Sequence, residues 1–328
     1  MRFGPLPLDQ ALGAILAHSH AVPGGRLRKG KVLTVEDIAA LRAAGEVEVV
    51  VARLDPEDLA EDAAAARIGA ALLGDPEGQG LRATPAATGR VNLIATGPGI
   101  LDLDPAGVAA LNAIDPAITL ATLPRYARVG PGTMAGTLKI IPYGVAGASV
   151  ARACAVPVGL RVRGPVFRNV TLIETHLGPH DPQKGEAAIR ARVEALGMAL
   201  DEVLSVPHRC AEVAGAIRAA GGGLVLILTA SATSDIADVA PQALREAGGT
   251  VTRFGMPVDP GNLLFLGEVG GRAVIGLPGS ARSPVPNGAD MVLDRIACGV
   301  AVSDADIAAM GVGGLLKETR ARGRPRAG

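Results

Sequence analysis

The second half of the chain alternates between short apolar runs and amphipathic stretches. The runs NVTLIET (169–175) and LVLILT (224–229) are typical of buried strands, and GTVTRFGM (249–256) and AVIGLP (273–278) predict two more. Apolar residues at helical spacing predict helices over four ranges: 186–200, 211–220, 239–247 and 288–298. This alternation favours a doubly wound α/β domain, in which helices cover both faces of a parallel sheet and ligands bind at the carboxyl ends of the strands.

The first 80 residues predict a small α/β region. Residues 8–18 place their apolar side chains on one helical stripe, which predicts a helix. These side chains are Leu8, Leu12, Ile15 and Leu16. Thr34 and Asp37 have the spacing of a capping box for a second helix, which Gly45 ends. A strand, VEVVVARL (47–54), and a helix over residues 55–73 follow.

The middle of the chain predicts mainly strands. Residues 74–89 are rich in Gly, Pro and Thr, a composition typical of a linker. From residue 90 to 158, short apolar runs such as VNLIA (91–95) alternate with Gly and Pro turns. We therefore predict four regions: a small α/β lid-like region over 1–80, a β-rich region over 85–160, an α/β domain over 161–303 and a C-terminal tail over 304–328.

Composition argues against several classes of partner. Lys plus Arg (32) balance Asp plus Glu (32), so net charge favours neither nucleic acid nor an anionic membrane surface. Aromatic residues make up 2% of the chain, too few to predict base-stacking platforms. Three widely spaced cysteines suggest a reducing compartment, and no apolar run approaches the length of about 18 residues that a membrane span needs. We expect a cytoplasmic protein.

The loop after the run LVLIL carries candidate chemistry. It contains Thr229, Ala230, Ser231, Thr233 and Ser234, whose hydroxyl and backbone N–H groups precede a helix and would suit a phosphate. Asp235 and Asp238 follow at a spacing at which either would hold Mg²⁺. The same residues would also serve as an ordinary helix cap, which spacing alone favours over a phosphate site.

No standard nucleotide-binding or hydrolase motif occurs, but the loop resembles a known family. TASATSDIADVAPQA (229–243) is similar to the phosphate loop of molybdopterin adenylyltransferases, with Thr229, Asp238, Val239 and Pro241 in matching places. MPVDPGN (256–262) and IGLPGSARSP (275–284) resemble the Pro-Gly and Gly-Leu-Pro-Gly loops of molybdopterin molybdotransferases. The N-terminal GGRLRKGKVLTVEDIAALRAAGEVEVVVARL (24–54) is similar to a region of the second enzyme.

This resemblance implies a C-terminal domain of the molybdopterin-binding type and a role in molybdenum cofactor synthesis or delivery. The implied ligand or substrate is molybdopterin. The resemblance leaves undecided whether Mg²⁺ and a nucleotide also bind. The implied binding residues are Thr229, Ala230, Ser231, Thr233, Ser234, Thr175, Lys184, Pro260, Gly261, Gly279, Ser280 and Arg282. In an enzyme, Asp238 would be the catalytic carboxylate, and Asp238 and Asp235 would bind the metal. The resemblance also implies a homodimer. A molybdoenzyme or another cofactor-synthesis protein is a further candidate partner.

Departures from the family pattern leave the activity undecided between a carrier and a Mg-dependent adenylyl- or molybdotransferase. The loop has Ala230, Ser231 and Thr233 where the adenylyltransferase has glycines. After the pair Val206 and Pro207, His208 stands in place of an aspartate.

One other cluster of candidate ligands follows the first strand of the α/β domain. Glu174, His176, His180 and Asp181 would either hold a metal or form a polar loop at the ligand-facing end of the sheet.

Overall fold

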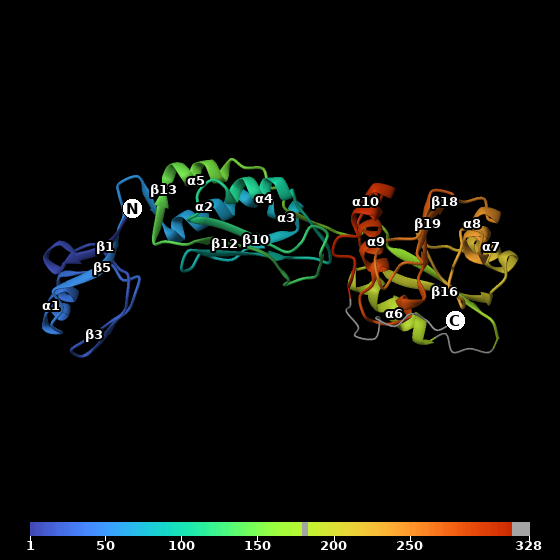
Figure 1. Ribbon diagram of the computed structural model, residues 1–328, viewed down its shortest axis with the longest axis horizontal. Helices are drawn as coiled ribbons and strands as arrows, with labels where there is room; N and C mark the ends of the chain where they lie inside the picture. The colour runs from blue at the N-terminus through green and yellow to red at the C-terminus, as the bar shows by residue number, and fades with distance from the viewer. Residues whose placement is uncertain (179–182, 317–328) are drawn as a thin grey trace. The chain divides into compact units, whose positions relative to one another are not determined.

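The computed structural model describes residues 1–178 and 183–316, excluding the side chains of Gln183 and Lys184. It divides the chain into two compact units (Figure 1). The first comprises Met1–Thr96, Leu101–Arg125 and Pro131–Arg161. The second comprises Gly97–Ile100, Tyr126–Gly130 and Val162–Gly328.

The first unit begins with a small sheet of strand order β1-β5-β2 and helix α1. The elements are β1 (Arg2–Pro7), η1 (Leu8–Gln10), β2 (Ile15–Leu16), β3 (His20–Val22), β4 (Gly25–Leu27), α1 (Val35–Ala43) and β5 (Glu48–Arg53). The predicted capping box is present, since Asp37 N donates to Thr34 Oγ1 at 3.3 Å and Thr34 N donates to Asp37 Oδ2 at 3.0 Å.

The predicted helix over residues 8–18 is wrong. Only η1 forms there, and Gly13 adopts a left-handed backbone conformation (φ 74°) that interrupts any helix. Ile15 and Leu16 instead pair with β5, and Leu12 of the predicted apolar stripe is exposed. Strand pairing in the folded chain therefore overrides the helical spacing of these residues.

The rest of the first unit is built around a sheet of order β10-β12-β8-β7. The elements are β6 (Asp58–Ala60), α2 (Glu61–Leu72), α3 (Pro76–Gln79), β7 (Leu81–Ala83), β8 (Arg90–Ala95), α4 (Pro105–Asn112), β10 (Ile118–Thr122), β12 (Met134–Ile140), β13 (Gly144–Ala146) and α5 (Gly147–Cys154). A further sheet, most of whose residues belong to the second unit, contains β11 (Arg128–Val129), β9 (Gly99–Asp102) and β14 (Arg161–Arg163). The helix predicted over 55–73 begins only at Glu61, and the segment predicted as a linker contains α3 and β7.

Within the described residues, the second unit has a six-stranded sheet of order β16-β15-β17-β20-β19-β18. Its strands are β15 (Asn169–His176), β16 (Ala199–Pro207), β17 (Leu224–Leu228), β18 (Thr250–Phe254), β19 (Phe265–Val269) and β20 (Arg272–Leu277). The prediction of a parallel sheet is wrong for one edge, because β18 and β19 are antiparallel to their neighbours. Gly270 and Gly271, both with positive φ, close a tight hairpin between β19 and β20.

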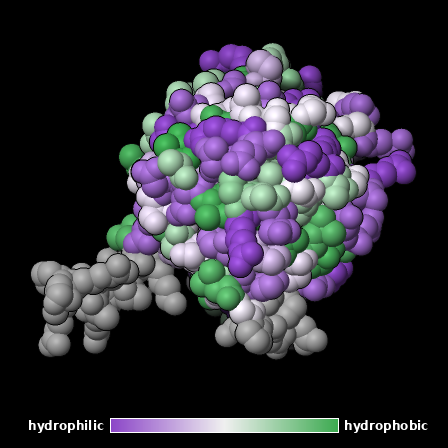
Figure 2. Space-filling view, turned by 90° about the vertical axis from the view of Figure 1, so that its right-hand side faces the viewer, coloured by the Kyte–Doolittle hydropathy of each residue, from purple (hydrophilic) through white to green (hydrophobic). Residues whose placement is uncertain are grey.

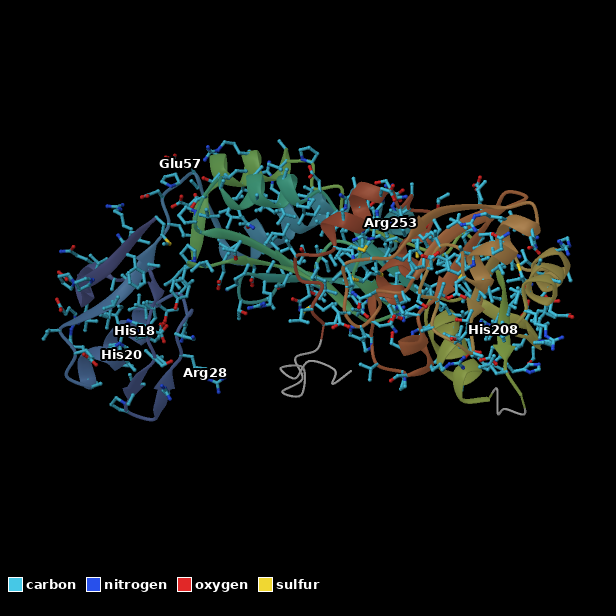
Figure 3. The ribbon with its side chains drawn as sticks, turned by 45° about the vertical axis from the view of Figure 1, so that its right-hand side comes forward. His18, His20, Arg28, Glu57, His208 and Arg253 are labelled. Carbon is cyan, nitrogen blue, oxygen red and sulfur yellow. The ribbon has the colours of Figure 1, made fainter. Side chains whose placement is uncertain are left out.

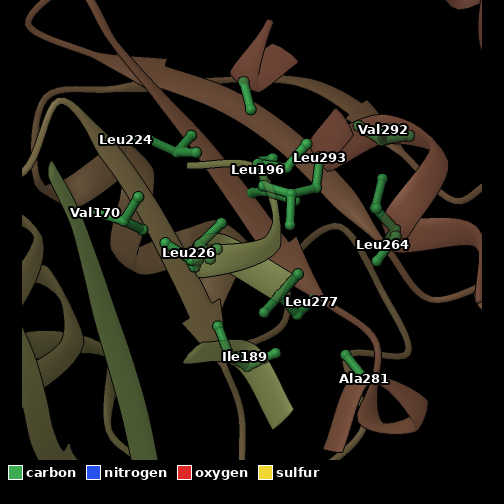
Figure 4. Close-up of a cluster of buried hydrophobic side chains, with 14 of the residues drawn as sticks. Val170, Ile189, Leu196, Leu224, Leu226, Leu264, Leu277, Ala281, Val292 and Leu293 are labelled. Carbon is green, nitrogen blue, oxygen red and sulfur yellow. The ribbon is translucent and has the colours of Figure 1, made fainter. Parts of the chain in front are cut away.

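Helices cover both faces of this sheet, as predicted. They are α6 (Gln183–Ala195), α7 (Cys210–Ala219), α8 (Val239–Glu246), α9 (Gly288–Ala297) and α10 (Asp304–Ala309), with a 3-10 turn η2 (Gly279–Arg282). Leu224, Leu226 and Leu228 of β17 pack into the core with α6, α9 and α10 (Figure 4), whereas Val225 and Ile227 pack with α7 and α8. Alternate residues of each strand thus face different helical layers.

The described part of the chain contains no helix long and apolar enough to cross a bilayer. On the face drawn in Figure 2, small clusters of hydrophobic residues lie among hydrophilic ones. Cys154, Cys210 and Cys298 are free thiols, of which Cys298 is buried.

Candidate functional site

Three loops of the second unit meet at the carboxyl end of its parallel strands. They follow β17, follow β20, and connect β18 with β19. Together they line an open pocket with a volume of ≈ 280 Å³. Its lining residues are Ala232, Asp259, Pro260, Gly261, Asn262, Leu263, Pro278, Gly279 and Ser280. The structure therefore brings together Pro260, Gly261, Gly279 and Ser280, which the sequence motifs had singled out.

The peptide group between Thr229 and Ala230 is fixed from both faces of the sheet. Arg282 Nη2 donates to the Thr229 carbonyl at 3.0 Å, and Ala230 N donates to Thr175 Oγ1 at 2.7 Å. The Ala230 N–H and the buried Thr175 hydroxyl, both predicted to contact a ligand, thus already bind each other. Their role in the structure is to position the loop.

The next three backbone N–H groups are free to bind a ligand. Within the described part of the chain, the N–H groups of Ser231, Ala232 and Thr233 donate no hydrogen bond. None of these residues has a positive φ, so the side chains that replace glycines cause no left-handed strain. Unpaired backbone N–H groups are donors that an anionic ligand can use.

The hydroxyl side chains of the loop differ in exposure. Thr229 and Thr233 are buried, and their Oγ1 atoms lie 3.5 Å apart. Ser231 and Ser234 are exposed, and Ser234 Oγ donates to the Ala232 carbonyl at 3.4 Å. Ser231 is therefore the hydroxyl of this loop best placed to reach a ligand.

Both aspartates of the loop are used as local caps. Asp238 is the N-cap of α8: Oδ1 accepts from Val239 N at 2.7 Å and Oδ2 from Ser234 N at 3.0 Å. Asp235 Oδ1 accepts from Ala237 N at 2.7 Å. Across the described residues, no group of three or more His, Cys, Asp or Glu side chains is arranged to hold a metal ion. This arrangement fits the capping interpretation.

The loop after β20 is held by the protein interior. Ala281 is fully buried beside the core residues Leu277 and Ile189 (Figure 4). The buried Arg192 of α6 donates to the Ala281 carbonyl at 3.0 Å and to the Ser283 carbonyl at 2.7 Å. Rigid support of this kind preorganises the two flanking polar residues, Ser280 and Arg282.

Ser280 and Arg282 have unused hydrogen-bonding capacity. Ser280 Oγ is buried and has no hydrogen-bond partner in the described part of the chain. Among the described residues, the Arg282 guanidinium makes one hydrogen bond, to Thr229, and its side chain is 33% exposed. An arginine has five N–H donors, so most of those on Arg282 are available to an oxyanion.

The end of β15 supplies residues on opposite faces of the sheet. Glu174, fully buried, faces Arg282, with its Oε1 3.8 Å from Arg282 Nη1. On the other face, Thr175 Oγ1 lies 2.9 Å from Nδ1 of His208, which Figure 3 labels in this unit. His180 and Asp181 of the predicted metal cluster lie outside the described residues, as does the side chain of Lys184.

Sequence reasoning missed the pairing of Glu174 with Arg282 and the role of Arg192. A usable signal for the pairing was the carboxylate inside NVTLIET, a run predicted to be a buried strand, because a charge on a buried strand requires a partner. The partner lies 108 positions further along the chain, and no local pattern connects the two.

Comparisons with known proteins identify no function. Residues 5–53 match a family model described as a domain of unknown function, DUF8806, and no curated protein matches. The chain is similar to the solved structure of the molybdopterin biosynthesis protein MoeA from Pyrococcus horikoshii, with 15% identity, 85% of this chain and 70% of that chain covered, and a TM-score of 0.27.

Two shorter solved chains are also similar. MoaB, a molybdopterin biosynthesis enzyme from Thermus thermophilus, is 19% identical over 40% of this chain and 89% of that chain, with a TM-score of 0.28. CinA, a protein with unknown function from Thermoplasma acidophilum, is 20% identical over 35% and 90%, with a TM-score of 0.24.

Proposed function

We propose that the second unit binds molybdopterin or its metal-loaded cofactor form, with the phosphate at the loop after β17. The observation that carries this proposal is the set of unpaired N–H groups at residues 231–233, beside an arginine with unused donors. Ser280 Oγ adds a further unpaired donor from the neighbouring loop. Backbone N–H groups and guanidinium donors are the groups with which proteins usually hold a phosphate.

The pterin part of the proposal is supported by sequence resemblance. The three loops that meet at the pocket are the three whose sequences resemble molybdopterin-handling enzymes. Asn262 and Leu263 add an amide and an apolar surface to the pocket wall, a combination suited to a flat polar ring. A role in molybdenum cofactor synthesis or delivery follows from this ligand.

A carrier fits the geometry better than a Mg-dependent transferase. Phosphoryl transfer depends on a cation that neutralises developing charge on the phosphate oxygens. Asp238 and Asp235, the carboxylates predicted for that cation, already accept backbone N–H groups. The transferase remains the second candidate because Asp238 stands where the adenylyltransferase pattern has its aspartate.

Replacement of Arg282 tests the proposal. We expect Arg282→Gln to weaken molybdopterin binding at least about tenfold, since a charge-assisted contact to phosphate is worth about 1.5–3 kcal/mol. Arg253→Gln is the matched control, because Arg253 lies in the same unit and its guanidinium is already used within the protein, by the Gly255 carbonyl at 2.9 Å and by Asp304 at 3.3 Å. Equal affinity of both variants and the wild type, measured by isothermal titration calorimetry, would exclude Arg282 from the site.

A further inference from the structure

The carboxyl group of Glu174 is unusually placed for a charged side chain. It is fully buried at the end of β15, and neither oxygen has a hydrogen-bond partner among the described residues. Leu228 and the first turn of α6 enclose it so tightly that a Cβ on Gly185 would lie 2.4 Å from Glu174 Oε1. Because a buried unpaired carboxylate is costly, a compensating charge or a proton must accompany it.

Arg282 is the group that supplies the compensating charge. Its Nη1 lies 3.8 Å from Glu174 Oε1, and its Nη2 contacts the Thr229 carbonyl. From α6, Glu186 also acts on Glu174, although Glu186 itself pairs with Arg190 at 2.7 Å. The neighbouring strands place Ser205 and Leu228, which are uncharged, opposite Glu174.

Burial and Glu186 raise the pKa of Glu174, and Arg282 opposes that rise. The charge state of Glu174 therefore depends on whether Arg282 is free to act on it. An oxyanion bound to Arg282 would neutralise the guanidinium and add a negative charge near the carboxyl group.

We propose that Glu174 is the counter-ion of Arg282 in the empty site and takes up one proton when an oxyanion binds. This inference rests on the proposed phosphate site. Glu174 competes with the ligand for Arg282 while it is ionised and stops competing once it is protonated. The affinity for a dianion therefore rises as pH falls, by at most about tenfold per pH unit for one linked proton.

The test is the affinity for inorganic sulfate between pH 5 and 8, because the charge of sulfate is constant over this range. We compare the wild type with Glu174→Gln by isothermal titration calorimetry in two buffers of different ionisation enthalpy, which reports proton uptake. All other ionisable groups are common to the wild type and Glu174→Gln, so the difference between the two proteins isolates Glu174. Glu186→Gln is the matched control, an acid on the same side of the sheet that is already paired with Arg190.

At pH 8 we expect Glu174→Gln to bind sulfate about tenfold more tightly than the wild type, with the two curves converging at pH 5. Proton uptake should fall in Glu174→Gln and remain in Glu186→Gln. Parallel affinity curves for the wild type and Glu174→Gln would overturn the inference and leave the phosphate site intact. An equal gain in sulfate affinity in Glu186→Gln would have the same meaning. No saturable sulfate binding to the wild type or Glu174→Gln at any pH would overturn the phosphate site itself.

Discussion

At the scale of single residues, the candidate site depends on one peptide group and on the two arginines that support it. Arg282 and Thr175 fix the peptide between Thr229 and Ala230 from opposite faces of the sheet. Arg192 holds the backbone on either side of Arg282. The three amides after that peptide are left without partners, and this geometry explains why a loop without glycines can still present them.

The close packing around Glu174 predicts an effect of Gly185. A Cβ added at Gly185 would lie 2.4 Å from Glu174 Oε1 and 2.9 Å from Arg282 Nη1. We expect Gly185→Ala to lower the free energy of unfolding by about 1–3 kcal/mol through overpacking, and to weaken sulfate binding because Arg282 is displaced. Chemical denaturation and calorimetry measure the two effects.

Gly215→Ala provides the comparison for Gly185→Ala. Gly215 lies inside α7 with no atom within 4 Å of an added Cβ, so alanine should stabilise the protein by about 0.5–1 kcal/mol. If both variants were stabilised equally, the tight contact around Glu174 would be disproved.

At the scale of elements, the start of α8 combines a cap with a candidate catalytic group, and two substitutions of Asp238 separate these roles. Asn retains the cap and removes the charge, whereas Ala removes both. We expect Asp238→Ala to cost about 1 kcal/mol of stability and Asp238→Asn much less, with molybdopterin binding kept in Asp238→Asn.

The same pair of variants addresses the alternative function. Formation of an adenylylated or metallated product from molybdopterin with Mg·ATP is measured for the wild type and Asp238→Asn. Product from the wild type, lost in Asp238→Asn despite normal stability, would contradict a carrier and establish the transferase.

Most elements of the second unit could be predicted because their signals are local. Alternate residues of LVLILT pack into two hydrophobic clusters, one on each face of the sheet, and the helices carry apolar residues at the expected spacing. Strands β16 and β19 were missed, although Gly270 and Gly271 carried the hairpin signal for β19. The helix expected over residues 8–18 failed because pairing with β5 determines that segment, and pairing partners cannot be deduced from spacing alone.

At the scale of the whole molecule, the linear order of the chain hides how its units are built. Residues Tyr126–Gly130 belong to the second unit although the first unit surrounds them in the sequence. Arg128 explains part of this assignment, because its Nε donates to both carboxylate oxygens of the buried Asp294 at 3.1 Å. Contacts between such distant positions determine the unit to which a segment belongs. No change in composition along the sequence indicates these contacts.

A sulfate titration of the 15N-labelled protein, followed by NMR, tests most directly whether the loops after β17 and β20 form one oxyanion site. We predict saturable shifts of the backbone amides of residues 231–233 and of Gly279–Arg282, all described by a single dissociation constant. Saturable shifts confined to the first unit, or different dissociation constants for the two loops, would contradict a single oxyanion site at these loops.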